Sequence, residues 1–261
     1  MSQPASSDPA NAPLAGKTAL VTGGARRIGR AIALALAASG ANVAITYRNS
    51  QSEAEDLVAA LSAYGVDAFA VRTELTDPDS IRHSVAAVVE EFGQLDLLVN
   101  NAGRFESAAL EDISAEQWDR IFATNTRAPF LVAQAACPHL RASHGRIVNI
   151  GSLGGLHPWA SHAHYCASKT ALHMLSQTMA KAWAPEISVN CVAPGMIKLT
   201  DAAPEAEAQS GPVDPYAHFA AKTPMLRNGT AQEVAAAVLF FATGPHFITG
   251  QLLAVDGGLG L

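Results

Sequence analysis

Charged residues are scarce in this chain of 261 residues: they make up 15% of the sequence, against 49% hydrophobic residues. So little charge and so much apolar surface exclude an intrinsically disordered protein and predict a large core. Basic residues are also few, because 17 lysines and arginines face 23 aspartates and glutamates, which gives a formal net charge of −6. This acidic balance argues against nucleic acid and anionic membranes as partners.

Paired cysteines, long apolar runs and a secretory signal are missing too. The three cysteines (Cys137, Cys166 and Cys191) have neither an even count nor metal-ligand spacing, which predicts a protein of the reducing cytoplasm. No apolar run approaches the roughly 18 residues that cross a bilayer. Residues 1–13 are rich in proline, alanine and serine and lack a basic start followed by an apolar stretch, so we expect a flexible tail there.

Strand-length apolar runs alternate with helix-length segments along the rest of the chain. The runs lie at 17–22, 42–47, 67–71, 95–99, 145–150, 187–192 and 251–255, and the segments at 27–38, 52–63, 78–91, 115–140, 164–183 and 231–242. Strands that are apolar on both faces and separated by helices predict one α/β domain over residues 14–261, with a Rossmann-like, doubly wound parallel sheet of about seven strands and helices on both faces. Residues 196–229 break the alternation and contain four prolines, and we expect this segment to form a substrate lid.

A glycine-containing turn, TGGARRIG at 22–29, follows the first predicted strand and opens the first helix. Its glycines allow the tight turn and the close helix–strand approach that a dinucleotide needs, and the helix N-terminus attracts pyrophosphate. The cofactor contacts predicted in this turn are Gly23, Arg26, Arg27, Ile28 and Gly29.

The end of the second predicted strand indicates which dinucleotide binds. NAD sites place an acidic residue there for the adenosine ribose, whereas this chain has TYRNS at 46–50 and no carboxylate before Glu53. Arg48 can form a charge-assisted pair with the 2′-phosphate of NADP, which a carboxylate would repel. We therefore predict NADP(H) as the cofactor, with contacts from Tyr47, Arg48, Asn49 and Ser50.

Six motifs in order resemble those of the short-chain dehydrogenase/reductase family over about residues 14–261. They are Thr22-Gly23…Gly29, Asn100-Asn101-Ala102-Gly103, Asn125, Ser152, Tyr165-x-x-x-Lys169 and Pro194-Gly195. The resemblance implies a seven-stranded parallel sheet and hydride transfer between a nicotinamide cofactor and a small-molecule substrate. It also implies a homotetramer or dimer in which the helices near 115–140 and 164–183 form the main subunit contact.

Four residues carry the chemistry that the resemblance implies. Tyr165 and Lys169 stand four residues apart, so they share one face of a helix. A phenol has a pKa of about 10 and needs roughly 4 kcal/mol of phenolate stabilisation to work near neutral pH, which a neighbouring ammonium and an oxidised nicotinamide can supply. The resemblance assigns Tyr165 as the proton donor to the carbonyl oxygen and Ser152 as the hydrogen-bond partner of that oxygen. Lys169 binds the nicotinamide ribose, and Asn125 holds a water that links the lysine to solvent.

The resemblance implies further cofactor contacts after the later strands. Small residues after 95–99 let the ribose lie against the backbone, and the segment after 187–192 packs on the nicotinamide. The family commonly has threonine two residues after Ile197, where this chain has Leu199. The implied contacts are Glu74, Leu75, Asn101, Ala102, Gly103, Tyr165, Lys169, Pro194, Gly195 and Ile197. No metal is predicted, because His162 and His164 have no carboxylate or cysteine at ligand spacing.

Arg27 leaves the substrate class open. It stands where most family members have glycine, and Thr-Gly-x-x-x-Arg-x-Gly resembles the branch that contains pteridine reductases. Its guanidinium can bind the pyrophosphate, the 2′-phosphate or a substrate oxygen. Pteridine reductases generally have aspartate where this chain has Ser152, and serine favours a carbonyl or alcohol substrate, such as a 3-oxoacyl compound or another small ketone. Dihydropterin reduction is the alternative, and a non-catalytic dinucleotide-binding sensor is the alternative of another class.

Overall fold

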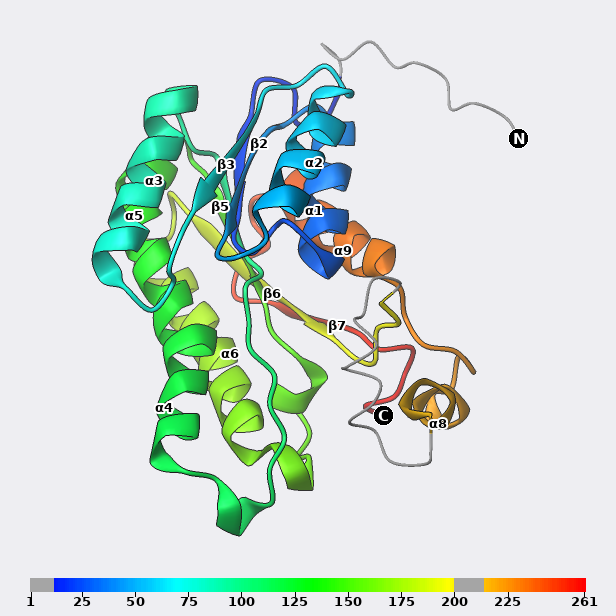
Figure 1. Cartoon of the computed structure of the whole chain (residues 1–261). Helices are drawn as coiled ribbons and strands as arrows, with labels where there is room; N and C mark the ends of the chain where they lie inside the picture. The colour runs from blue at the N-terminus through cyan, green and yellow to red at the C-terminus, as the bar shows by residue number, and fades with distance from the viewer. Residues whose placement is uncertain (1–11, 200–213) are drawn as a thin grey trace.

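Seven parallel strands form one sheet in the computed structural model, which describes residues 12–199 and 214–261 (Figure 1). The strand order is β3-β2-β1-β4-β5-β6-β7. The chain runs from β1 to β3 toward one edge of the sheet, then crosses back and runs from β4 to β7 toward the other edge, so the switch point lies between β1 and β4. This doubly wound, Rossmann-like sheet confirms the predicted fold class. The predicted tail at 1–13 lies outside the described residues except for its last two, as does the middle of the predicted lid, residues 200–213.

The bounds of each strand lie within two residues of the bounds of a predicted apolar run. The strands are β1 (Thr18–Val21), β2 (Asn42–Tyr47), β3 (Ala68–Arg72), β4 (Leu97–Asn100), β5 (Arg146–Ile150), β6 (Ser188–Pro194) and β7 (Leu252–Val255). Every residue of β1, β4 and β6 is buried. Burial on both faces is the pattern expected of a parallel sheet between two helical layers.

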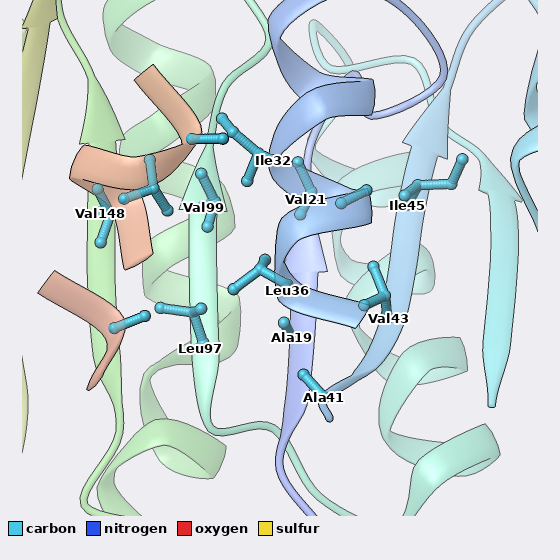
Figure 2. Close-up of a cluster of buried hydrophobic side chains, with 14 of the residues drawn as sticks. Ala19, Val21, Ile32, Leu36, Ala41, Val43, Ile45, Leu97, Val99 and Val148 are labelled. Atoms are coloured by element: carbon cyan, nitrogen blue, oxygen red, sulfur yellow. The ribbon is translucent and has the colours of Figure 1, made fainter. Parts of the chain in front are cut away.

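Two layers of helices cover the sheet. The first layer consists of α1 (Arg27–Ala38), α2 (Gln51–Ser62) and α9 (Ala231–Thr243), and the second of α3 (Pro78–Phe92), α5 (Ala128–Ala142) and α6 (Ala163–Trp183). Successive residues of β1 point to opposite layers, as strand geometry requires. Val21 therefore packs with Ile32 and Leu36 of α1, as Figure 2 shows, while Leu20 packs in the core beneath the second layer.

Local signals fix where several helices begin and end. Asp77 caps α3 by accepting the N–H of Asp79 at 2.9 Å, and the helix ends at Gly93, whose φ of +73° lies in the left-handed region. Thr230 and Glu233 form a capping box at the start of α9. These caps fix where α3 begins and ends and where α9 begins.

The segment predicted as one helix at 115–140 is divided. It consists of α4 (Ala115–Phe122), a π-helical turn η3 (Ala123–Arg127) and α5. This turn is only five residues long and lies between two helices, so helical periodicity did not reveal it. The remaining described elements are short: α8 (Pro215–Lys222) and the 3₁₀ turns η2 (Leu110–Asp112), η4 (Leu153–Gly155) and η5 (Ala160–His162). Within the described ranges, no helix has both the length and the apolar composition that a membrane crossing requires.

Candidate active site

The predicted site residues gather at the carboxyl edge of the sheet, around the point where the strand order reverses. Gly23 follows β1, Asn101 follows β4, and Ser152 follows β5, and the registers β1–β4 and β4–β5 place these three loops side by side. In open α/β sheets this crevice is where ligands bind. The site is therefore assembled from loops that are far apart in the sequence.

Hydrogen bonds join the loop after β1 to the loop after β4. The Thr22 hydroxyl accepts the N–H groups of Asn101 at 3.0 Å and Ala102 at 3.1 Å. In return, the Asn101 side chain donates to the carbonyls of Thr22 at 2.9 Å and Gly23 at 3.1 Å. Gly23 also donates its N–H to the Thr46 hydroxyl, which links the loop to β2. Three neighbouring strands thus hold the turn in one shape.

The start of α1 has the features of an anion-binding helix end. Its N-cap, Arg26, makes no side-chain capping bond, and the first turn has no acidic residue, so the helix dipole favours an anion at this end. A Cβ at Gly29 would lie 2.4 Å from the Gly23 carbonyl oxygen, so only glycine lets the helix approach this closely. Arg27 has a φ of +55°, in the left-handed region that favours glycine. Ile28 packs against the core on the other side.

A pocket of about 520 Å³ lies at the ends of β2 and β3, lined by Arg48, Asn49, Arg72, Thr73, Glu74 and Ser80. The Arg48 guanidinium is 4.0 Å from the Glu74 carboxylate. The Thr76 hydroxyl, which donates to Glu74 at 2.8 Å, is the largest cause holding the Glu74 pKa below its usual value, and Arg48 also lowers it. The pocket therefore combines two guanidinium groups, hydroxyls and one ionised carboxylate.

Other predicted cofactor contacts lie around the start of α1 and around the pocket at the ends of β2 and β3. Tyr47 ends β2 and packs against the core between the sheet and the first helical layer, while Leu75 packs against the core beneath the second layer. Arg26 pairs with Glu53 across 3.4 Å. Pro194 ends β6, and Ile197 forms an isolated bridge with Gly229, so the two described ends of the predicted lid lie together.

Four side chains predicted as catalytic lie at this edge of the sheet. Tyr165 and Lys169 come from the first turns of α6, and the Lys169 amine lies 6.0 Å from the centre of the Tyr165 ring. The lysine donates to the Ile150 carbonyl at 2.8 Å, which ties it to the end of β5. A Cβ at Gly103 would lie 3.5 Å from both the Lys169 amine and the side-chain amide oxygen of Asn125, so the loop after β4 completes the cluster.

Asn125 lies in the π-helical turn with its amide bonded to protein on both sides. Its oxygen accepts the Arg104 N–H at 2.7 Å, and its nitrogen donates to the Arg104 carbonyl at 2.9 Å and the Ser168 hydroxyl at 3.0 Å. These bonds pin the loop after β4 to α6. The wide turn is what brings this fully buried amide to face them.

Burial sets the charge states of the central pair. It raises the pKa of Tyr165 to about 12, and the hydrogen bond with the Ser152 hydroxyl only partly opposes the rise. It lowers the pKa of Lys169 to about 8. At neutral pH the protein therefore holds a protonated phenol, which can donate a proton, beside an amine that is still mainly charged.

Aromatic side chains surround the Tyr165 ring. Phe105 meets it edge-on, with ring centres 4.8 Å apart, and Trp159 lies nearly parallel to it at 6.1 Å. His162 stacks on Phe105 at 4.6 Å. Sequence reasoning missed Phe105, whose only signal is a position just beyond β4. In the part of the chain that the structure describes, no cluster of His, Cys, Asp or Glu could hold a metal ion.

Sequence reasoning also missed two polar residues. Arg72, the last residue of β3, lines the pocket beside Arg48, and its Nε donates to the Arg48 carbonyl at 3.1 Å. His173 of α6 is buried beneath Ser152. Their available signals were weak: a strand end for the arginine, and a spacing of four from Lys169 for the histidine.

Comparisons with known proteins agree over nearly the whole chain. A family model described as enoyl-(acyl carrier protein) reductase matches residues 23–260. The 3-oxoacyl-(acyl-carrier-protein) reductase FabG of Staphylococcus aureus is 37% identical over 248 residues, which cover 93% of this chain and 98% of that protein.

Solved structures give the same picture. A short-chain dehydrogenase from Burkholderia cenocepacia in complex with NADP is 40% identical, with a TM-score of 0.86 over 95% of this chain and 100% of the other. A blue fluorescent protein from a metagenomic library, in complex with NADPH, is 36% identical, with a TM-score of 0.85 and the same coverage.

Proposed function

Because the chain belongs to the short-chain dehydrogenase/reductase family, we propose that it reduces the carbonyl group of a 3-oxoacyl-type compound or another small ketone, and oxidises the corresponding alcohol in reverse. It is an oxidoreductase that depends on NADP(H). One observation carries the proposed chemistry: a half-buried Tyr165, which keeps its proton at neutral pH, lies beside Lys169 at the carboxyl edge of the sheet, with the Ser152 hydroxyl near enough to lower the pKa of the phenol.

The residues of the cofactor site fit a phosphorylated dinucleotide. The uncapped start of α1 offers N–H donors to pyrophosphate, and the pocket with Arg48 and Arg72 offers two cations to a 2′-phosphate. Gly23 after β1 and Ala102 after β4 lie side by side, since a Cβ at Gly23 would lie 3.1 Å from Ala102, and small residues at both positions would let the ribose approach the backbone closely. NADPH, when bound, supplies the hydride.

In the proposed mechanism the protein's side chains donate one proton to the substrate oxygen and stabilise the negative charge that develops during the reaction. The Ser152 hydroxyl holds the substrate oxygen, and the Tyr165 phenol donates its proton to that oxygen as charge develops on it. The Lys169 ammonium stabilises the resulting phenolate electrostatically. Asn125 keeps the proposed role of holding a water near the lysine; its amide donors are taken by Arg104 and Ser168, so that water would bind a remaining oxygen lone pair or the main chain.

The cofactor preference is expected to depend on Arg48. NADPH should bind at least about tenfold more tightly than NADH, because a phosphate–guanidinium pair is a charge-assisted hydrogen bond. Arg48→Asp should reverse this preference, since it places a carboxylate where the 2′-phosphate would lie. Fluorescence titration of both cofactors against the parent and the variant measures the two dissociation constants.

Arg82→Asp is the matched control, because Arg82 is an exposed residue of α3 that pairs with Asp79 and is not among the residues that line the pocket of Arg48. It should leave the ratio of the two affinities unchanged. Equal affinities of the parent protein for NADPH and NADH would show that Arg48 makes no contact with the phosphate.

The substrate class is decided by a panel assayed with NADPH. It contains 3-oxoacyl thioesters, small ketones and diketones, and dihydropterins. We expect turnover of a carbonyl compound. The pteridine alternative has no support among the relatives described above, and turnover of dihydropterins alone would overturn the proposal. If the protein binds NADPH but turns over nothing in the panel, the result would favour the alternative of a non-catalytic dinucleotide-binding sensor.

We also propose a homotetramer or dimer assembled through α4, α5 and α6. Apolar side chains are exposed on these helices, namely Trp118, Phe130 and Met174, and Phe130 borders a groove of about 670 Å³. Light scattering should give a mass of at least twice 27.1 kDa. A monomer at micromolar concentration would contradict this. We keep the cytoplasm as the proposed location, because the three cysteines are unpaired.

A further inference from the structure

A buried histidine lies directly behind the proposed catalytic serine. His173 follows Lys169 by four residues and Tyr165 by eight, so all three side chains project from one face of α6. The His173 side chain is 8% exposed and lies under the loop that carries Ser152. The proposed mechanism gives this residue no role.

The histidine ring contacts the serine loop closely on both sides. The Ser152 N–H donates to Nε2 at 3.4 Å, a long bond whose effect depends on how firmly the ring is held. A Cβ at Gly151 would lie 2.3 Å from Nε2, and a Cβ at Gly155 would lie 2.5 Å from Cε1. Ring and loop therefore fit only because both flanking positions are glycine.

The ring is neutral, which makes it a hydrogen-bond acceptor. Burial is the main cause that lowers the pKa of His173 to about 4, and the charge of Lys169 lowers it further. The Cys191 thiol, which lies beside Gly151, is also neutral, because burial raises its pKa to about 11. Because Nε2 accepts from Ser152, we assign the proton of the neutral ring to Nδ1, for which no hydrogen-bond partner is found in the described part of the chain.

We propose that His173 is a positioning residue, which accepts the N–H of Ser152 and fills the space between Gly151 and Gly155. It thereby fixes the direction of the Ser152 hydroxyl. That hydroxyl already accepts the Gly154 N–H at 3.0 Å, and it keeps one O–H donor, which the proposed mechanism assigns to the substrate oxygen. Small displacements of such a group are costly for catalysis. This inference rests on the proposed function, because it assigns His173 an effect through Ser152.

Two substitutions separate the acceptor from the volume of the ring. His173→Leu keeps a similar volume without an acceptor, and we expect kcat to fall about 10- to 50-fold while the affinity for NADPH is unchanged. His173→Gln restores an acceptor and should return kcat to within about threefold of the parent. His83→Leu, an exposed histidine of α3, is the matched control and should change nothing.

A double-mutant cycle distinguishes positioning from general damage to the fold. In a Ser152→Ala background, His173→Leu should lower kcat by less than about twofold, because the group that it positions is already absent. An equal loss in both backgrounds would overturn the proposal. If the leucine variant does not fold, the glutamine variant decides: a folded His173→Gln protein that loses kcat tenfold or more would overturn it as well.

An activity-independent measurement keeps this inference separate from the proposed function. Exchange of the Ser152 amide proton, followed by NMR in the NADPH-bound protein, should be about tenfold faster in His173→Leu and near the parent rate in His173→Gln. Unchanged exchange in the leucine variant would disprove the contact. If the parent reduces no carbonyl compound, the proposed function fails, and the exchange rates still decide whether His173 holds the loop.

Discussion

Tyr165→Phe is expected to lower kcat by roughly 10²- to 10⁴-fold, the range typical for the loss of a general acid. The substitution removes only the hydroxyl, while the ring keeps its contacts with Phe105 and Trp159. Burial holds the phenol in its protonated form, so what is lost is the proton that the substrate oxygen receives. Steady-state kinetics with NADPH and the best substrate of the panel measure the effect.

Two controls identify the cause of the loss. The affinity of Tyr165→Phe for NADPH should stay close to that of the parent, because the loss should appear in kcat rather than in cofactor binding. Tyr64→Phe changes an exposed tyrosine in the turn after α2 and should have no effect. A Tyr165→Phe protein with more than about a tenth of the parent's kcat would show that another group donates the proton.

Ser152→Ala should lower the turnover of a ketone by roughly 10²-fold or more, by analogy with the loss of an oxyanion donor. The serine hydroxyl matters most when negative charge develops on the substrate oxygen. A pteridine instead develops charge on a ring nitrogen, and pteridine reductases, which the Arg27 motif resembles, generally have aspartate at the position of Ser152. The measurement therefore compares the parent, Ser152→Ala and Ser152→Asp with a ketone and a dihydropterin at fixed NADPH.

The two substrate types give opposite outcomes. If the substrate is a ketone, both variants should be slow with it. Dihydropterin reduction that survives Ser152→Ala and rises in Ser152→Asp, in a parent that reduces no ketone, would contradict the carbonyl reading. Ser62→Ala, at an exposed position near the end of α2, is the control for removing a hydroxyl elsewhere.

The fold could be predicted because its signals are local. Strands buried on both faces produce unbroken apolar runs, so each strand could be located within two residues of its observed position. The division of the 115–140 segment could not be predicted, because the π-helical turn is held by the bonds of Asn125 to Arg104 and Ser168. Those partners lie 21 and 43 residues away and belong to other elements.

Some residues of the candidate site could likewise be predicted from local sequence signals, and others could not. Tyr165, Lys169 and Ser152 could be named from short motifs, since their spacing along the chain carries the pattern. Arg72 and His173 could not, because their place in the site depends on neighbours supplied by the fold. The first becomes a candidate only beside Arg48 at the ends of two paired strands, and the second only beneath the serine loop.

The left-handed conformation of Arg27 has a consequence for the thermodynamics of ligand binding. Such a conformation costs a non-glycine residue roughly 1–2 kcal/mol and persists only where the surroundings enforce it. Here the bonds around Thr22 and Asn101 fix the turn before it, and α1 fixes the chain after it. Ordering a loose residue costs about 1–2 kcal/mol of conformational entropy. Because this loop is ordered on folding, an incoming dinucleotide meets a preorganised surface, and that entropy does not subtract from its affinity.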